Sequence, residues 1–129
     1  MQFLFESCLA LLVFILFFTI FIFKFKGMKE ILIKTEFSKS KILIGESIKN
    51  VGKYLPDKKT VIITDENILK LYKNDLPDFP TVVMGLGEKN KTLRTIDFIL
   101  SKFLEFEVDR SWFVLAVGGG IVCDVAGFA

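Results

Sequence analysis

The order of apolar and polar residues predicts short strands and helices behind an apolar N-terminal segment. Aliphatic and β-branched runs predict strands over residues 30–35, 41–44, 60–64, 81–86 and 112–117. Because the turn-prone segment Ser38–Ser40 separates the first two runs, these strands are expected to form an antiparallel hairpin. The later three strands alternate with helical stretches, and this alternation is typical of a parallel sheet.

Helices are predicted where a start signal precedes apolar residues at helical spacing. Ser47 precedes one such stretch, which ends before Pro56, and a second begins around Asp65. Thr92 is expected to cap a longer helix. The apolar residues expected on its buried side are Leu93, Ile96, Leu100, Phe103 and Leu104. The predicted fold class is therefore α/β, with a Rossmann-like parallel sheet and flanking helices.

Residues 1–27 differ in composition from the rest of the chain. Of the fifteen phenylalanines, eight lie among the first 26 residues, which contain only three charged side chains. The apolar segment 2–23 is long enough to cross a bilayer as a transmembrane helix, and the lysines after it would keep residues beyond Lys24 in the cytoplasm. A mis-called start is the alternative, because Met28 directly precedes a plausible first strand. A folded domain is predicted over residues 28–129.

The last residues of the chain predict a ligand site. Three glycines, Gly118 to Gly120, follow the apolar run 112–117, and the next residues suit the start of a helix. Glycines allow a ligand to approach the backbone closely, and the free N–H groups of a helix start favour a phosphate. The sequence continues for only a few residues beyond them. We therefore expect the first part of a longer protein, with this helix not fully formed.

Polar residues also follow the other two parallel strands, at Asp65–Asn67 and Glu88–Lys91. Ligands of such sheets bind at the carboxyl ends of the strands, so these clusters and Gly119–Asp124 are expected at one edge. Each cluster also has a purely structural interpretation, as a helix cap, a solvated loop or a tight turn. Their convergence favours a dinucleotide site, in which a carboxylate contacts a ribose and glycine N–H groups contact a pyrophosphate.

These motifs resemble, in the same order, those of the 3-dehydroquinate synthase family. The resemblance rests on T-D-E-N at 64–67, G-E-K-N-K-T-L at 87–93, D-R-S at 109–111 and G-G-G-I-V-C-D-V-A-G-F-A at 118–129. It covers the N-terminal, NAD-binding part of the family, over roughly residues 28–129. Cys123 is a departure, because the family more often has glycine there, and we expect this small side chain to be tolerated.

The resemblance implies which residues would bind NAD. The adenosine end would contact Asp65 and Asn67, and the nicotinamide-side ribose and its surroundings would contact Glu88 and Lys91. The pyrophosphate crevice would be lined by Gly119, Gly120, Ile121 and Asp124. No catalytic residue and no metal ligand is expected among these 129 residues, which contain no histidine.

The resemblance also implies a lyase of the shikimate pathway, which leads to chorismate and the aromatic amino acids. Such an enzyme uses NAD and a divalent metal, zinc or cobalt, to convert 3-deoxy-D-arabino-heptulosonate 7-phosphate into 3-dehydroquinate and phosphate. The family's metal ligands and most of its substrate-binding residues lie in its C-terminal half, so this fragment alone is expected to be inactive. The intact family is expected to form homodimers, and we expect a cytoplasmic location.

Other functions remain alternatives at this point. A related sugar-phosphate cyclase or an iron-type polyol dehydrogenase would share the glycine motif. A membrane-anchored, non-catalytic dinucleotide-binding remnant is an alternative of another class. Nucleic-acid binding has little support, because the basic residues form no patch and the charges nearly balance. Two cysteines in unrelated contexts give no disulfide framework.

Overall fold

The computed structural model describes residues 27–36 and 38–129. The apolar segment 2–23, the possible transmembrane helix of the sequence analysis, lies outside these residues. Within the described part of the chain, no helix is both long enough and apolar enough to span a membrane. The chain divides into two compact units, the first ending at Ser47 and the second comprising Ile48–Ala129.

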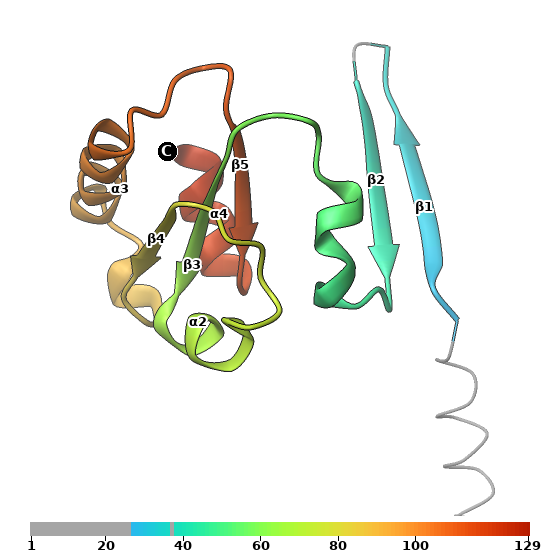
Figure 1. Cartoon of the computed structure of the whole chain (residues 1–129), viewed down its shortest axis with the longest axis horizontal. Helices are drawn as coiled ribbons and strands as arrows, with labels where there is room; N and C mark the ends of the chain where they lie inside the picture. The colour runs from blue at the N-terminus through green and yellow to red at the C-terminus, as the bar shows by residue number, and fades with distance from the viewer. Residues whose placement is uncertain (1–26, 37) are drawn as a thin grey trace, which may run out of the picture. The chain divides into compact units, whose positions relative to one another are not determined.

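The first unit contains the predicted hairpin (Figure 1). Strand β1 (Lys29–Lys34) pairs antiparallel with strand β2 (Lys39–Ile44). The turn lies slightly before the predicted Ser38–Ser40, because β2 already begins at Lys39. The backbone N–H of Thr35 donates to the carbonyl of Ser38 at 2.8 Å and closes this turn.

The second unit is an α/β domain built on a parallel sheet. Its elements in chain order are η1 (Ile48–Tyr54), β3 (Thr60–Asp65), α2 (Glu66–Tyr72), β4 (Thr81–Met84), η2 (Glu88–Asn90), α3 (Leu93–Glu105), β5 (Phe113–Val117) and α4 (Gly120–Phe128). The three strands lie in the order β4-β3-β5, and β3 is parallel to both neighbours (Figure 1). The predicted α/β class, with a parallel sheet and flanking helices, is confirmed.

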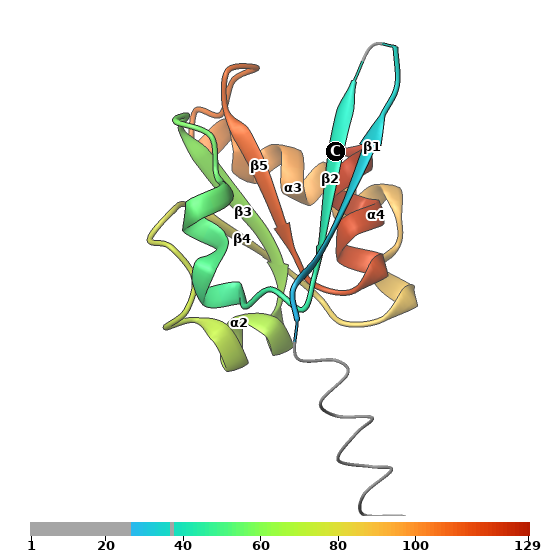
Figure 2. The ribbon, with the colours of Figure 1, turned by 90° about the vertical axis from the view of Figure 1, so that its right-hand side faces the viewer.

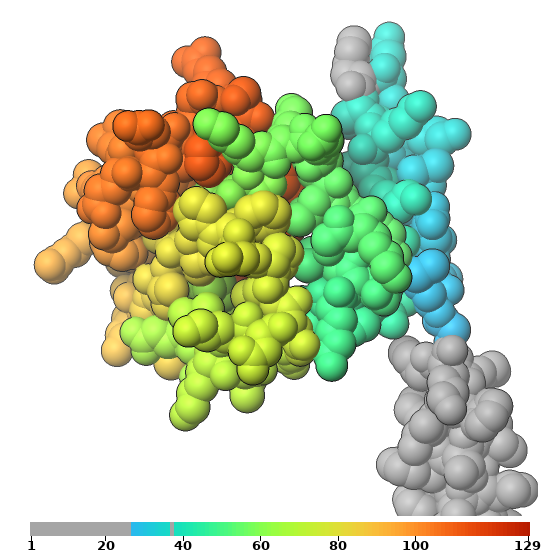
Figure 3. All heavy atoms as spheres, viewed as in Figure 1, coloured from blue at the N-terminus to red at the C-terminus, as the bar shows by residue number. Residues whose placement is uncertain are grey.

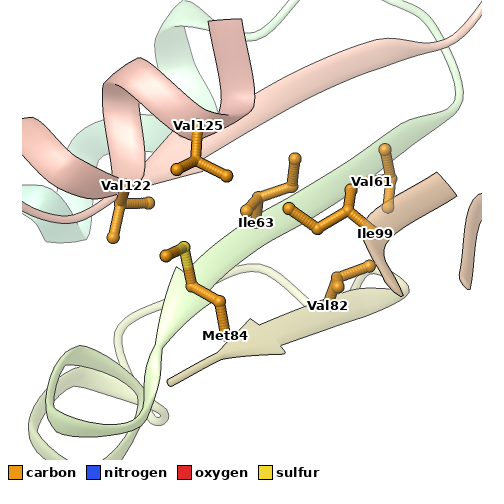
Figure 4. Close-up of a cluster of buried hydrophobic side chains, with 7 residues drawn as sticks. All are labelled: Val61, Ile63, Val82, Met84, Ile99, Val122 and Val125. Carbon is orange, nitrogen blue, oxygen red and sulfur yellow. The ribbon is translucent and has the colours of Figure 1, made fainter. Parts of the chain in front are cut away.

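The core of this unit lies between the sheet and helices α3 and α4, which cover one face of it (Figure 2). Figure 4 shows Ile63 of β3, Met84 of β4, Ile99 of α3 and Val122 of α4 within one apolar cluster. Strand β3 is buried on both faces from Thr60 to Thr64, as expected for the central strand of a parallel sheet.

Several predicted elements differ from the structure in type or extent. The stretch after Ser47 forms a 3-10 helix, η1, rather than an α-helix. The strand predicted to reach residue 86 ends at Met84, and the chain then leaves the sheet through a turn in which Gly87 adopts a φ of 82°. Strand β5, at one edge of the three-stranded sheet, is more exposed than the central strand β3. Helix α4 forms over nine residues and buries Val122 and Val125. The expectation that this helix is not fully formed stays a prediction.

The buried side of α3 was predicted only in part. Ile96 and Phe103 pack against the core as expected, and Ile99, which was not among the predicted residues, is fully buried. Leu93 and Leu104 are instead 75% and 80% exposed. Apolar residues occupy a wider arc of this helix than the sheet covers, so part of the arc faces outward.

Candidate functional site

A cleft lies where the three parallel strands end. Strands β3, β4 and β5 end at Asp65, Met84 and Val117, at the same edge of the sheet. Strand β3 leads directly into α2, and β4 and β5 are each followed by a turn. A cavity of about 110 Å³ lies among these strand ends. Its lining residues are Asp65, Met84, Gly85, Gly87, Gly119, Gly120, Ile121 and Val122. The cavity therefore brings together the carboxylate at the end of β3 and glycine backbone from the turns after β4 and β5.

Asp65 has both a structural contact and a place in this cleft. Its Oδ1 accepts a hydrogen bond of 2.9 Å from the backbone N–H of Ile68, which makes Asp65 the N-cap of α2. The interpretation of Asp65 as a helix cap is thus confirmed. An ionised carboxylate has a second oxygen and further lone pairs, so capping leaves Asp65 able to accept a hydrogen bond from a ligand hydroxyl.

The turn after β5 presents the start of a helix to the cleft. Gly119 is the N-cap of α4, and its position provides no side-chain cap for the first N–H groups of the helix. A Cβ atom built on Gly119 or Gly120 would have no neighbour within 4 Å. An anion could therefore approach this helix start, where uncapped N–H groups and the helix dipole favour negative charge.

Gly118 has a different role from its two neighbours. A Cβ atom on Gly118 would lie 2.5 Å from Cγ2 of Val122, a residue that is 2% exposed. The first glycine of the triplet is thus required by packing inside the domain, and the second and third border open space.

The turn after β4 is held by the side chain of Asn90. Its Nδ2 donates a hydrogen bond of 2.6 Å to the carbonyl of Leu86. Its Oδ1 lies 2.9 Å from the position that a Cβ atom on Gly85 would occupy. Asn90 and Gly85 therefore fit each other closely, and Asn90 holds the turn whose Gly85 and Gly87 line the cleft.

Lys91 and Asp124 form an ion pair that joins the segment before α3 to α4. The Lys91 Nζ and Asp124 Oδ2 atoms are 2.7 Å apart. The hydrogen bond with Asp124 and its negative charge raise the pKa of Lys91 above 10.5. Both side chains are about half exposed, so water screens the pair and its contribution to stability is small. Because the pKa is raised on folding, that contribution is complete at neutral pH and is lost only as the pH rises above about 10.5.

The structure separates the eight predicted NAD-binding residues into three groups. Four of them line the cleft: Asp65, Gly119, Gly120 and Ile121. Lys91 and Asp124 line a second hollow of about 250 Å³ between the start of α3 and α4. Asn67 and Glu88 are exposed and line neither cavity. The cleft thus brings four of the eight residues together, and the NAD contacts assigned to all eight stay predictions.

Sequence reasoning missed the residue that ties two of these strand ends together. The hydroxyl of Thr64, which is fully buried, donates a hydrogen bond of 2.7 Å to the carbonyl of Val117. This bond joins the end of β3 to the end of β5 directly before the glycine turn. A hydroxyl at the end of a buried apolar strand needs a hydrogen-bond acceptor. This requirement could have predicted that Thr64 bonds to a neighbouring strand.

The described residues do not provide a metal site. Nowhere among them do three His, Cys, Asp or Glu residues gather in a way that could hold an ion. The whole sequence also lacks histidine, a common ligand of zinc and cobalt. A zinc or cobalt ion therefore does not fit the donor groups of this part of the chain.

The fold and the cleft define a Rossmann-like α/β domain with a site at the carboxyl ends of its strands. Two solved structures of 2-deoxy-scyllo-inosose synthase share this fold, with TM-scores of 0.55 and 0.58 and sequence identities of 24% and 22%. Each match covers 78% of this chain and 30% or 31% of the solved chain. One of them is described as complexed with carbaglucose-6-phosphate, NAD+ and Co2+.

Sequence comparison names the family to which the chain is similar. The family model described as 3-dehydroquinate synthase N-terminal matches residues 81–129. The 3-dehydroquinate synthase of Clostridium acetobutylicum is 36% identical over 89 residues, which cover 63% of this chain and 25% of the relative. The enzyme of Blochmanniella pennsylvanica is 33% identical over 116 residues, which cover 79% of this chain and 32% of the relative. The resemblance to this family is confirmed, and the chain spans about a quarter to a third of the length of these relatives.

Proposed function

We propose that this chain supplies the NAD-binding part of a 3-dehydroquinate synthase, a lyase that releases phosphate from a heptulosonate phosphate. The observation that carries the proposal is the cleft at the ends of β3, β4 and β5, where Asp65 and the glycine turn before α4 line one cavity. The matches to relatives named 3-dehydroquinate synthase support this reaction. A related cyclase has weaker support, since the cyclase structures are at most 24% identical and indicate the fold alone.

The residues of the cleft fit a dinucleotide. The uncapped start of α4, with open space at Gly119 and Gly120, suits a pyrophosphate, and the Asp65 carboxylate suits a ribose diol. NAD, when bound, would supply reversible hydride transfer with a substrate alcohol. The part proposed for this chain is to bind the dinucleotide and fix its orientation. In this proposal Lys91 contacts the nicotinamide-side ribose and its surroundings, and Asp124 borders the pyrophosphate crevice.

The remaining parts of the reaction are not assigned to these residues. The divalent metal does not fit the described donor groups. In the relatives, a further part of the chain lies beyond the region matched here. Residues equivalent to that part would supply the metal ligands and most of the site for the heptulosonate phosphate. We therefore propose no proton transfer and no metal-assisted step for the side chains of this cleft.

The test joins the full chain to the part of the Clostridium acetobutylicum enzyme that lies beyond the matched region. In this fusion, Gly120→Val is expected to raise the Kd for NAD at least about tenfold, or about 1.4 kcal/mol. The valine would occupy the open space that a pyrophosphate needs, and its Cβ would have no neighbour within 4 Å beyond adjacent residues and the helix's own backbone. NAD affinity is measured by calorimetry, phosphate release by a colorimetric assay, and folding by thermal denaturation.

The matched control is Gly52→Val in η1, because a Cβ atom there also meets nothing within 4 Å. We expect it to leave the Kd for NAD unchanged. Equal affinity of the parent fusion and a folded Gly120→Val variant would contradict the proposed pyrophosphate site. A fusion that binds NAD normally but releases no phosphate would favour a non-catalytic dinucleotide-binding protein.

A further inference from the structure

Thr64 has a buried hydroxyl at the end of the central strand, close to the candidate site. Thr64 is fully buried, and its Oγ1 donates a hydrogen bond of 2.7 Å to the carbonyl oxygen of Val117. The two residues are also the last pair in the register of β3 and β5. Thr64 itself does not line the cleft. Any effect of this hydroxyl on the cleft must therefore pass through the end of β5.

The carbonyl that Thr64 holds belongs to the peptide group that opens the glycine turn. A peptide group is planar, so the carbonyl of Val117 and the N–H of Gly118 rotate together. Gly118 is itself held by packing, because a Cβ atom there would lie 2.5 Å from Cγ2 of Val122. The two glycines that follow border open space at the cleft. The turn is thus held where it leaves the sheet and open where a ligand would approach it.

We propose that Thr64 is a positioning residue for the pyrophosphate of NAD, an inference that rests on the function proposed above. Its hydroxyl fixes the peptide group after Val117, and so holds the uncapped N–H groups at the start of α4 in place before the ligand arrives. A ligand that meets an ordered turn does not have to order it on binding. Without the hydroxyl, the cost of ordering the turn weakens NAD binding.

Thr60 provides a matched comparison on the same strand. It is 2% exposed, and its Oγ1 donates to the carbonyl of Lys58 at 3.1 Å, at the end of β3 opposite to the cleft. Side chains alternate along a strand, so Thr60 and Thr64 share one face of β3. Val61 and Ile63 lie on the other face, in the core formed with α3 and α4. Figures 2 and 3 show the residues that follow α2 on the side of the sheet away from these two helices.

The experiment compares the same substitution at both threonines in the fusion enzyme described above. Thr64→Val and Thr60→Val each replace a buried hydroxyl by a methyl group of similar size, and both are expected to lower the temperature of unfolding. Only Thr64→Val is expected to raise the Kd for NAD, at least about fivefold, because the loosened turn lies at the pyrophosphate site. Thr60→Val should bind NAD like the parent. The Kd is measured by calorimetry at a temperature at which the compared variants are folded.

Two further variants separate the hydroxyl from the packing of the side chain. Thr64→Ser keeps a hydroxyl donor and is expected to retain the Kd of the parent within about twofold. Thr64→Cys has a weaker donor of similar size, so its Kd is expected to lie between those of Thr64→Ser and Thr64→Val. If Thr64→Val does not fold, equal Kd values for Thr64→Ser and Thr64→Cys would overturn the proposal.

Hydrogen exchange without NAD measures the turn directly. The N–H of Cys123 donates to the carbonyl of Gly119 at 3.1 Å, across the start of α4. Exchange of this N–H, followed by mass spectrometry, is expected to be faster in Thr64→Val than in the parent and unchanged in Thr60→Val. The same rate in Thr64→Val and the parent would show that the hydroxyl does not act through the turn, which would overturn the proposal.

The outcomes distinguish this inference from the proposed function. A parent fusion that binds no NAD would contradict the proposed function, and the role of Thr64 with it. When the parent binds NAD, an unchanged Kd for folded Thr64→Val, or an equal rise for Thr60→Val, would overturn the positioning role alone. Equal weakening by Thr64→Ser and Thr64→Val would also overturn it, because the hydroxyl would then not be the cause.

Discussion

Gly118 is the glycine of the triplet whose replacement should cost folding stability. A Cβ atom would lie 2.5 Å from Cγ2 of Val122, which is buried and cannot move outward freely. We expect Gly118→Ala to lower the free energy of unfolding by about 1–3 kcal/mol, the usual range for an overpacked core. Gly120→Ala, whose Cβ meets nothing within 4 Å, is the control. Urea denaturation of both variants measures the difference, and equal stability would show that Val122 adjusts without cost.

Asp65 allows its structural role to be separated from a role in ligand binding. Asp65→Ala removes the bond to the N–H of Ile68 and should cost about 1 kcal/mol of stability. Asp65→Asn retains a side-chain oxygen that can cap α2, so its stability should remain close to that of the parent. In the fusion enzyme, Asp65→Asn is nevertheless expected to weaken NAD binding several-fold, because it removes the carboxylate charge proposed to receive a ribose hydroxyl. A normal Kd for this variant would leave Asp65 with its structural role alone.

At the scale of single residues, local signals in the sequence were sufficient for some contacts and not for others. The caps at Asp65 and Thr92 were predictable, because a cap joins residues three positions apart. The bond from Thr64 to Val117 spans 53 positions and depends on how the strands pair. The fit of Asn90 against Gly85 depends likewise on the path of a turn, which residue type alone does not determine.

The helix α3 provides a test at the scale of an element. Ile99 is fully buried against the sheet, so Ile99→Ala is expected to cost about 2–5 kcal/mol, the loss of a buried side chain plus a cavity. Leu104 is 80% exposed, and Leu104→Gln should change stability by less than about 0.5 kcal/mol. Chemical denaturation of the two variants gives both values. A larger loss of unfolding free energy for Leu104→Gln than for Ile99→Ala would contradict this assignment. Leu104 would then lie on the buried side of α3, as the periodicity of the sequence predicts.

The sequence was sufficient to predict which strands and α-helices form and in what order they follow. It was less reliable for the residues at which they begin and end. The β-branched run at β3 and the helical spacing at α3 are strong local signals, and both elements are present. Strand β4 ends at Met84, before the turn in which Gly87 has a φ of 82°, and β5 is more exposed than the central strand β3. Both depend on the tertiary arrangement of the chain.

At the scale of the whole molecule, residues 1–27 are predicted to be dispensable for folding of the rest. The motivation is the abrupt change in composition before Met28, directly ahead of β1. We expect the fusion enzyme with and without residues 1–27 to bind NAD with the same affinity and to unfold at the same temperature. Loss of NAD binding in the shorter form would show that the apolar segment belongs to the folded protein.

The final prediction concerns the activity of the full chain by itself. We expect no release of phosphate from the heptulosonate phosphate, and NAD binding that is weak compared with that of the fusion enzyme. The chain spans only 25% of the Clostridium acetobutylicum relative and has no histidine. The cost of ordering the dinucleotide would therefore fall on the few residues of one cleft of about 110 Å³. Phosphate release is followed with NAD and zinc present, against a sample without protein and against the fusion enzyme. Release above the protein-free sample that disappears in Lys91→Ala would mean that these residues contain catalytic machinery assigned above to the rest of the enzyme.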